Sequence, residues 1–127
     1  MRYRSDGPLK LMLQRLDIEP NELEAHAAQA AAMLRSMSNT WRLLVLCNLV
    51  KGEKSVGELQ RIVGISQSAL SQHLATLRAK KLVAIRRDAQ TIYYRLNGPE
   101  VAAILTTLYA LYCGPSPLIC GLDADGI

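Results

Sequence analysis

The stretch 55–77, SVGELQRIVGISQSALSQHLATL, constrains the fold most strongly because it predicts two short helices and the turn between them. Ser55 and Glu58 stand three residues apart, as in the capping box that begins a helix. Gly64 interrupts the helical pattern, and Ser66 is a suitable cap for a second helix. Two short helices joined by a glycine turn are typical of a helix-turn-helix, whose second helix enters the DNA major groove.

The second helix of this pair has one apolar and one neutral polar side. Its apolar side carries Leu70, Leu74 and Leu77, at the spacing of a buried helix face. Neutral hydroxyl, amide and imidazole groups can bond both base edges and phosphates. We therefore predict a DNA-binding surface made of these polar residues, together with basic and amide side chains that follow them: Ser66, Gln67, Ser68, Ser71, Gln72, His73, Arg78, Arg86, Arg87 and Gln90.

The flanking segments complete a winged helix-turn-helix. Apolar spacing predicts helices over 21–37, 40–50 and 100–113. The helix over 40–50 is apolar on almost every side, which predicts that this helix is buried together with Cys47. Alternating residues on either side of 88–90 predict a β-hairpin. The expected class is mainly α with a small β-hairpin wing, in the order α-α-α-α-β-β-α. We expect an N-terminal arm with a short helix over 1–20, one DNA-binding and dimerisation domain over 21–113, and a mobile tail over 114–127.

The charge distribution favours a polyanionic partner for the middle of the chain. Residues 41–98 carry ten basic and three acidic side chains, whereas residues 99–127 carry three acidic and no basic ones. Charge alone is equally compatible with an ordinary solvated basic face. The sequence has no apolar run of the roughly 18 residues that a membrane span needs. Its start, MRYRSDGPLK, does not have the features of a signal peptide, so we expect a cytoplasmic protein.

Residues 33–113 resemble the ArsR/SmtB family of repressors, most closely over SVGELQRIVGISQSALSQHLATLRAKKLVAIRRDAQTIYYRL. The resemblance implies a homodimer formed by the first and last helices, operator DNA as partner, and repression that an inducer releases. Two metal sites familiar in this family are absent from the sequence. The first helix of the helix-turn-helix has no Cys-x-Cys, and the last helix has no histidine. We therefore predict no metal site and no cofactor.

The contexts of Cys47 and Cys113, RLLVLCNLV and LYALYC, resemble the BigR/SqrR/HlyU branch of the family. That branch implies a dithiol switch in which reactive sulfur species or oxidants bridge these two cysteines and DNA is released. Cys120 lies outside the branch pattern. The alternative is an As(III)-responsive repressor that uses all three cysteines as thiolate ligands. An enzyme is not expected, because the sequence has no phosphate loop, paired-carboxylate pattern or metal motif.

Overall fold

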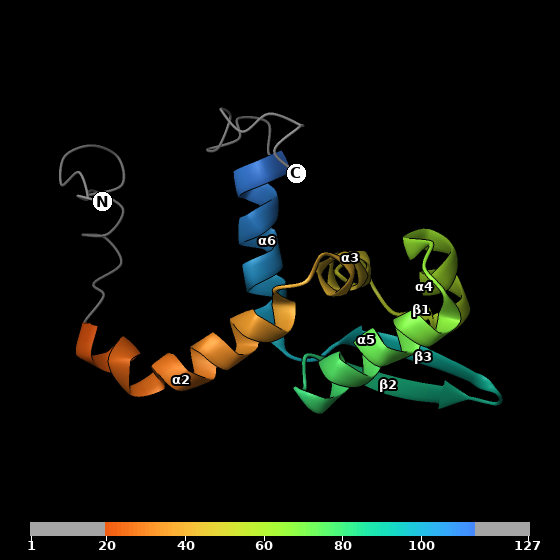
Figure 1. Ribbon diagram of the computed structural model, residues 1–127, viewed down its shortest axis with the longest axis horizontal. Coiled ribbons are helices and arrows are strands. Elements are labelled where there is room, and N and C mark those ends of the chain that lie inside the picture. The colour runs from red at the N-terminus through yellow and green to blue at the C-terminus, as the bar shows by residue number, and fades with distance from the viewer. Residues whose placement is uncertain (1–19, 114–127) are drawn as a thin grey trace. The chain divides into compact units, whose positions relative to one another are not determined.

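The computed structural model describes residues 20–113 (Figure 1). In chain order the elements are α2 (Pro20–Met37), α3 (Thr40–Leu49), β1 (Lys54–Ser55), α4 (Val56–Val63), α5 (Gln67–Ala79), β2 (Val83–Asp88), β3 (Thr91–Leu96) and α6 (Pro99–Cys113). The chain divides into two compact units between Leu34 and Arg35, which are described separately. The short helix predicted within 1–20 and the predicted tail 114–127 lie outside the described residues.

The helix-turn-helix forms as the sequence predicts. The Ser55 backbone N–H donates to Glu58 Oε1, the Glu58 N–H donates to Ser55 Oγ, and both distances are 3.1 Å. Gly64 ends α4 in the left-handed conformation with φ of 76°, where glycine has no steric penalty. Ser66 then accepts a hydrogen bond from the Ala69 N–H at 3.2 Å and caps α5. Local sequence signals therefore fix both ends of the turn.

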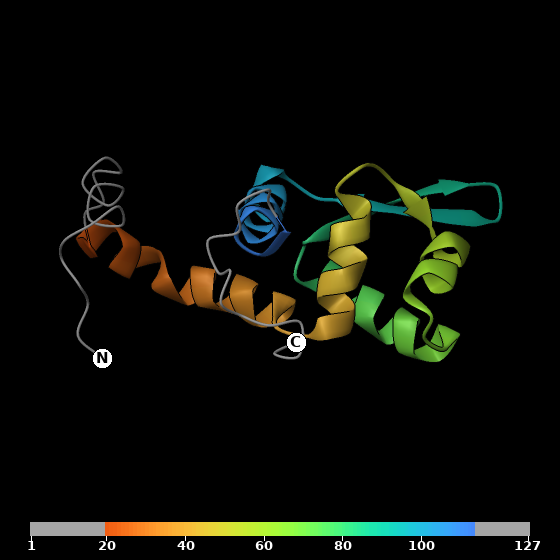
Figure 2. The ribbon, with the colours of Figure 1, turned by 90° about the horizontal axis from the view of Figure 1, so that it is seen from above.

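The core of the second unit is made where α3, α4 and α5 meet. Leu46 of α3, Leu59 of α4 and three leucines of α5 are almost completely buried, and the α5 residues are Leu70, Leu74 and Leu77. α3 lies between α6 on one side and the α4–α5 pair on the other (Figures 1 and 2). Because α3 packs on α5, a change in the position of α3 also shifts α5, the helix predicted to contact DNA.

The β-hairpin is present and carries one strand more than the sequence predicts. β2 and β3 pair antiparallel around a turn in which Ala89 has φ of 56°. β1 adds a third antiparallel strand, so that the sheet order is β1-β3-β2 and Ser55 lies opposite Tyr93. β1 was not predictable because two residues are too few to show alternation. Because β1 directly precedes α4, its backbone hydrogen bonds to β3 attach the start of α4 to the wing.

The two outer helices form as predicted, with apolar side chains left at the surface. In the first unit, Leu23 and Leu34 of α2 are exposed. In the second unit, α6 buries Val101 and Leu105 but leaves Tyr109 64% and Tyr112 51% exposed. Within residues 20–113, no helix combines the length and the apolar character needed to cross a membrane.

Candidate functional site

The polar side of α5 is open to solvent, as a DNA-reading surface requires. The predicted residues on it that are exposed are Ser66, Gln67, Ser68, Ser71, Gln72 and Arg78. His73 differs because it is only half-exposed. It follows Leu70 by three residues and precedes Leu77 by four, which places it at the edge of the buried stripe. No charged side chain interrupts the polar side before Arg78.

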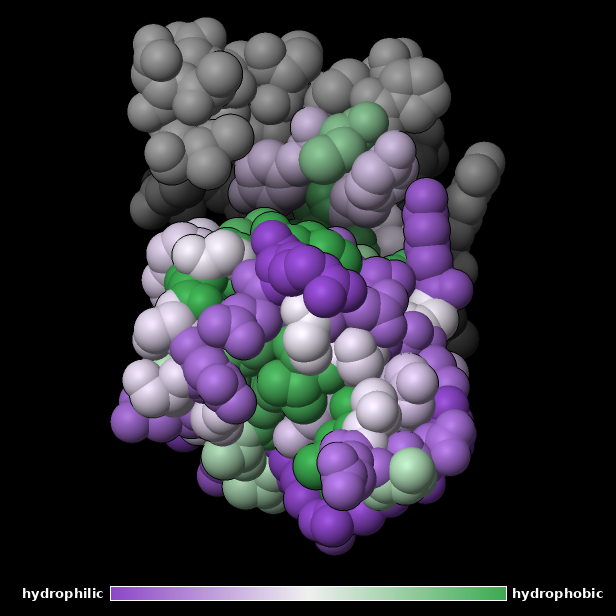
Figure 3. Space-filling view, turned by 90° about the vertical axis from the view of Figure 1, so that its right-hand side faces the viewer, coloured by the Kyte–Doolittle hydropathy of each residue, from purple (hydrophilic) through white to green (hydrophobic). Residues whose placement is uncertain are grey.

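A groove of about 940 Å³ lies between α5 and the wing, and we call it the α5–wing groove. Its lining includes four predicted DNA-binding residues: Gln67, Ser71 and Arg78 from α5, and Gln90 from the hairpin turn. Ser55, Gly57 and Tyr94 also line it, and the sequence did not predict this because their place depends on the pairing of β1 with β3. Figure 3 looks onto this end of the domain, where hydrophilic residues surround a hydrophobic strip.

The two wing arginines lie on opposite faces of the sheet, because successive residues of a strand alternate. Arg87 is paired with Ile92, which lines the α5–wing groove, so Arg87 lies on the groove side. Within residues 20–113, Arg87 makes no ion pair. Of the two arginines, Arg87 is therefore the one available to a phosphate beside the groove.

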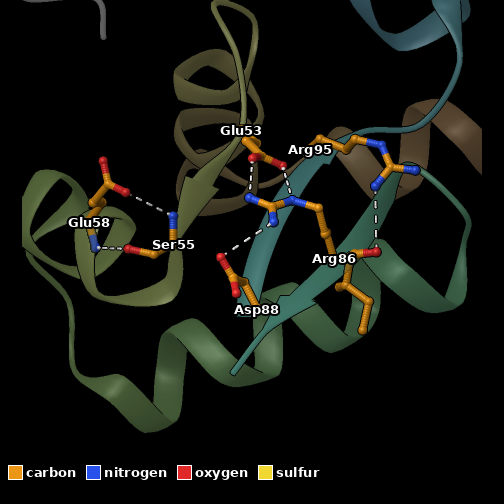
Figure 4. Close-up of polar contacts among 7 residues, drawn as sticks. Glu53, Ser55, Glu58, Arg86, Asp88 and Arg95 are labelled. Atoms are coloured by element: carbon orange, nitrogen blue, oxygen red, sulfur yellow. Dashed lines mark hydrogen bonds and ion pairs between the residues drawn. The ribbon is translucent and has the colours of Figure 1, made fainter. Parts of the chain in front are cut away.

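Arg86 is held by other parts of the protein (Figure 4). Its Nη2 lies 2.6 Å from Glu53 Oε1, its Nε donates to Glu53 Oε2 at 3.2 Å, and its guanidinium stacks 4.5 Å from the centre of the Tyr93 ring. Nη1 also lies 3.8 Å from Asp88 Oδ2. The hydrogen bond from Arg86 lowers the pKa of Glu53, so the pair persists at neutral pH and is lost as the pH falls through that lowered pKa. Arg86 thus fastens the wing to the segment before α4.

This difference predicts distinct effects for the two arginines. Arg87→Ala is expected to weaken operator binding about three- to tenfold and to reduce the salt dependence by about one phosphate contact. Arg86→Ala is expected to lower the thermal midpoint, because it frees Glu53, while the salt dependence stays close to that of the unmodified protein. Binding titrations over a salt series and thermal melts measure both. Equal salt slopes for the Arg87→Ala variant and the unmodified protein would contradict the assignment.

The two predicted switch cysteines lie on neighbouring elements, and both are free thiols exposed at the surface. Cys47 lines a second hollow, of about 600 Å³, together with Leu105, Thr106 and Tyr109 of α6. Cys113 comes one helical turn after Tyr109, on the same side of α6.

The prediction that Cys47 is buried is wrong. Leu44, Cys47 and the C-cap residue Val50 follow one another at every third residue along one side of α3. Within the described residues this side is exposed, although it is as apolar as the buried side.

The two thiols are also close enough to influence each other electrostatically. Partial burial raises the pKa of Cys47, and the negative charge of a Cys113 thiolate raises it further. Cys47 is therefore mostly protonated at neutral pH. Because the thiolate is the nucleophile, its reactivity increases with pH.

We expect the pH dependence of Cys47 alkylation by iodoacetamide to report this environment. The rate rises as the pH passes a pKa above the ordinary cysteine value, because only the thiolate reacts. Cys113→Ser removes the smaller cause, so the midpoint shifts to lower pH but stays above the ordinary value, since burial remains. Peptide mass spectrometry over a pH series measures the Cys47 rate alone. A midpoint that does not move in Cys113→Ser would show that the thiols are not in electrostatic contact.

The described residues offer no metal centre. Within 20–113, no three His, Cys, Asp or Glu side chains gather as a metal ion requires. Cys120, the third thiolate of the arsenic alternative, lies outside the described residues.

Comparison with known proteins decides the family. The sequence profile of bacterial regulatory proteins of the arsR family matches residues 40–84, which run from α3 into β2. The transcriptional activator HlyU of Vibrio cholerae is 49% identical over 113 residues, which cover 89% of this chain and 96% of that protein. The chain belongs to the ArsR family of bacterial transcriptional regulators.

Other ArsR-family members are similar over most of their length. The biofilm growth-associated repressor of Xylella fastidiosa is 40% identical over 92 residues, covering 72% of this chain and 81% of that one. The solved structure of the transcriptional repressor BigR from Xylella fastidiosa superposes with a TM-score of 0.73 at 38% identity and covers 76% of this chain and 98% of its own. Reduced HlyU from Vibrio cholerae has a TM-score of 0.69 and covers 72% of this chain and 97% of its own. The winged helix-turn-helix is thus confirmed, and the chain is a DNA-binding regulator rather than an enzyme.

Proposed function

We propose that this ArsR-family protein is a repressor whose binding to operator DNA is switched off when Cys47 and Cys113 become bridged. The single observation that carries the switch is the placement of two exposed thiols on α3 and α6 within electrostatic reach of each other, with Cys47 in a hollow that α6 helps to line. The inducer is a reactive sulfur species or an oxidant. The branch resemblance of the two cysteine contexts agrees with this placement.

Operator binding is assigned to the exposed polar side of α5 and to the groove side of the wing. Gln67 and Ser71 border the α5–wing groove and offer hydrogen-bonding groups to base edges, while Arg78 and Arg87 offer charge to phosphates. The remaining predicted contacts are Ser66, Ser68, Gln72, His73 and Gln90, with His73 at the edge of this surface. Arg86 contributes by holding the wing, through Glu53.

The regulator acts as a homodimer in which α2 and α6 supply the interface. The exposed Leu23 and Leu34 of α2, and Tyr112 of α6, are apolar or aromatic groups of the kind that a subunit interface covers. In a dimer each α5 meets one half-site, and half-sites read by such helices lie about 34–36 Å apart. A small change in the relative orientation of the two subunits therefore removes DNA contacts at one half-site or at both.

The switching chemistry is thiol–persulfide exchange. One protein thiolate attacks the outer sulfur of an organic persulfide RS–SH, which forms a protein persulfide and expels the thiolate RS⁻. The second protein thiolate attacks the inner sulfur of that persulfide, which forms a disulfide and releases hydrosulfide. In total, two thiols and one RSSH give one disulfide, one RSH and one H₂S. The bridge ties α3, which packs on α4 and α5, to α6.

Intact mass of the reduced protein after an organic persulfide, and separately after hydrogen peroxide, tests this proposal and identifies the inducer. A bridged product that forms only with persulfide indicates a sulfur-selective sensor, and some of this product can retain extra sulfur atoms. A loss of two hydrogens with both reagents indicates a general thiol-oxidation switch. No change with either reagent contradicts the dithiol switch and favours the arsenic alternative, which Cys120→Ser then tests.

A further inference from the structure

The hollow beside Cys47 has a composition that the switch alone does not explain. We call it the Cys47 pocket, and it is lined by Cys47, Asn48, Val50, Lys51, Lys54, Leu105, Thr106 and Tyr109. Its volume of about 600 Å³ is in the range that holds a small organic molecule.

The charge of the pocket is positive. Lys51 and Lys54 line it, and neither makes an ion pair within residues 20–113. Glu53 stands between them in the chain, but its carboxylate is already bonded to Arg86 at 2.6 Å and 3.2 Å. Lys54 also lies within electrostatic range of Glu58, whose carboxylate accepts the Ser55 N–H in the capping box. Two ammonium groups are thus left to attract an anion from solution.

The other walls of the pocket suit the uncharged body of such a ligand. Val50, Leu105 and the Tyr109 ring are apolar or aromatic. Asn48 donates its amide N–H to the Leu44 carbonyl at 2.8 Å, which leaves its side-chain oxygen as an acceptor for a ligand N–H. Thr106 donates its hydroxyl to the Ala102 carbonyl at 2.8 Å, so its oxygen can likewise accept. An organic acid that carries amide or amine groups complements this set.

We propose that the Cys47 pocket binds carboxylate-bearing organic persulfides, with Lys51 and Lys54 holding the carboxylate while the terminal sulfur faces Cys47. The inference rests on the proposed switch and names the class of sulfur donor that the switch accepts. Cys47 thiolate attacks the outer sulfur of the bound RS–SH, a new S–S bond forms on Cys47, and RS⁻ leaves and takes up the proton. Lys51 and Lys54 are positioning residues that raise the rate of this first step for anionic donors.

Two persulfides of opposite net charge test the pocket. In a Cys113→Ser/Cys120→Ser protein only Cys47 can react, so intact mass follows the gain of one sulfur. We expect glutathione persulfide, which carries carboxylates, to react about three- to tenfold faster than cysteamine persulfide, which carries an ammonium group. In the same background, Lys51→Gln/Lys54→Gln should bring the two rates together. Salt of about 1 M should do the same, because it reduces the screening length to about 3 Å.

Lys80→Gln/Lys81→Gln is the matched control, because it removes the same charge at the end of α5, among residues that do not line the pocket. It should leave the preference for glutathione persulfide unchanged. Equal rates for both donors in the unmodified pocket, or a preference that survives Lys51→Gln/Lys54→Gln, overturn the pocket while the dithiol switch stands. If the protein with all three cysteines forms no bridge with any persulfide, the switch fails and the pocket proposal fails with it.

Discussion

Ser71→Glu is expected to reduce operator affinity about a hundredfold, because a carboxylate would face phosphates and base acceptors where like charges cost several kcal/mol. Ser71 is exposed on the polar side of α5 and lines the α5–wing groove. Glutamate forms helices well, so α5 itself should be unaffected. Fluorescence anisotropy with operator DNA measures the loss, and circular dichroism verifies the fold.

Ser38→Glu is the matched control for this prediction. Ser38 is also exposed, but it lies between α2 and α3, next to the cap residue Asn39 and away from the α5–wing groove. The same change of side chain should alter operator affinity less than about threefold, through net charge alone. If Ser38→Glu and Ser71→Glu weaken binding equally, the polar side of α5 is not the surface that contacts DNA.

Cys113→Ser is expected to abolish the response to persulfide without weakening DNA binding by the reduced protein. Allosteric coupling of about 1–3 kcal/mol corresponds to a loss of affinity of roughly 5- to 150-fold when the unmodified protein is bridged. The variant has no second thiol on α6, so it stops at the Cys47 persulfide, and its affinity should change less than about twofold. Because Cys113 is exposed at the end of α6, the substitution should change stability by no more than about 0.5 kcal/mol.

Cys120→Ser serves as the control for the thiol chemistry. The dithiol switch predicts that this variant releases DNA as the unmodified protein does. A response that survives in Cys113→Ser but disappears in Cys120→Ser would assign the switch to a different pair of thiols. Operator titrations before and after persulfide treatment, on the same three proteins, distinguish these outcomes.

The sequence predicted those parts of the fold that depend on neighbours along the chain. The capping box, the helix break at Gly64 and the leucine stripe of α5 are local signals, and each forms as predicted. β1 escaped prediction because its two residues become a strand only through pairing with β3. Ser55 was therefore recognised as a helix cap but not as part of the α5–wing groove.

The candidate sites depend more on tertiary structure, and the sequence predicted them less completely. Arg86 and Arg87 look equivalent in the sequence, but strand alternation and the acceptor on Glu53 give the two side chains different contacts. Cys47 was expected in the core because α3 is apolar all round, yet its stripe remains exposed. The sequence did not predict that Lys51 and Lys54 line a pocket, because the pocket forms only where α6 lies beside α3.

The most direct test of the switch is operator affinity measured on one sample whose bridging state is known by mass. The reduced protein is titrated with operator DNA, treated with glutathione persulfide until intact mass shows complete bridging, titrated again, and then re-reduced. The dithiol switch predicts weaker binding by roughly 5- to 150-fold in the bridged sample and full recovery after reduction. Full bridging of Cys47 to Cys113 with unchanged operator affinity would contradict it.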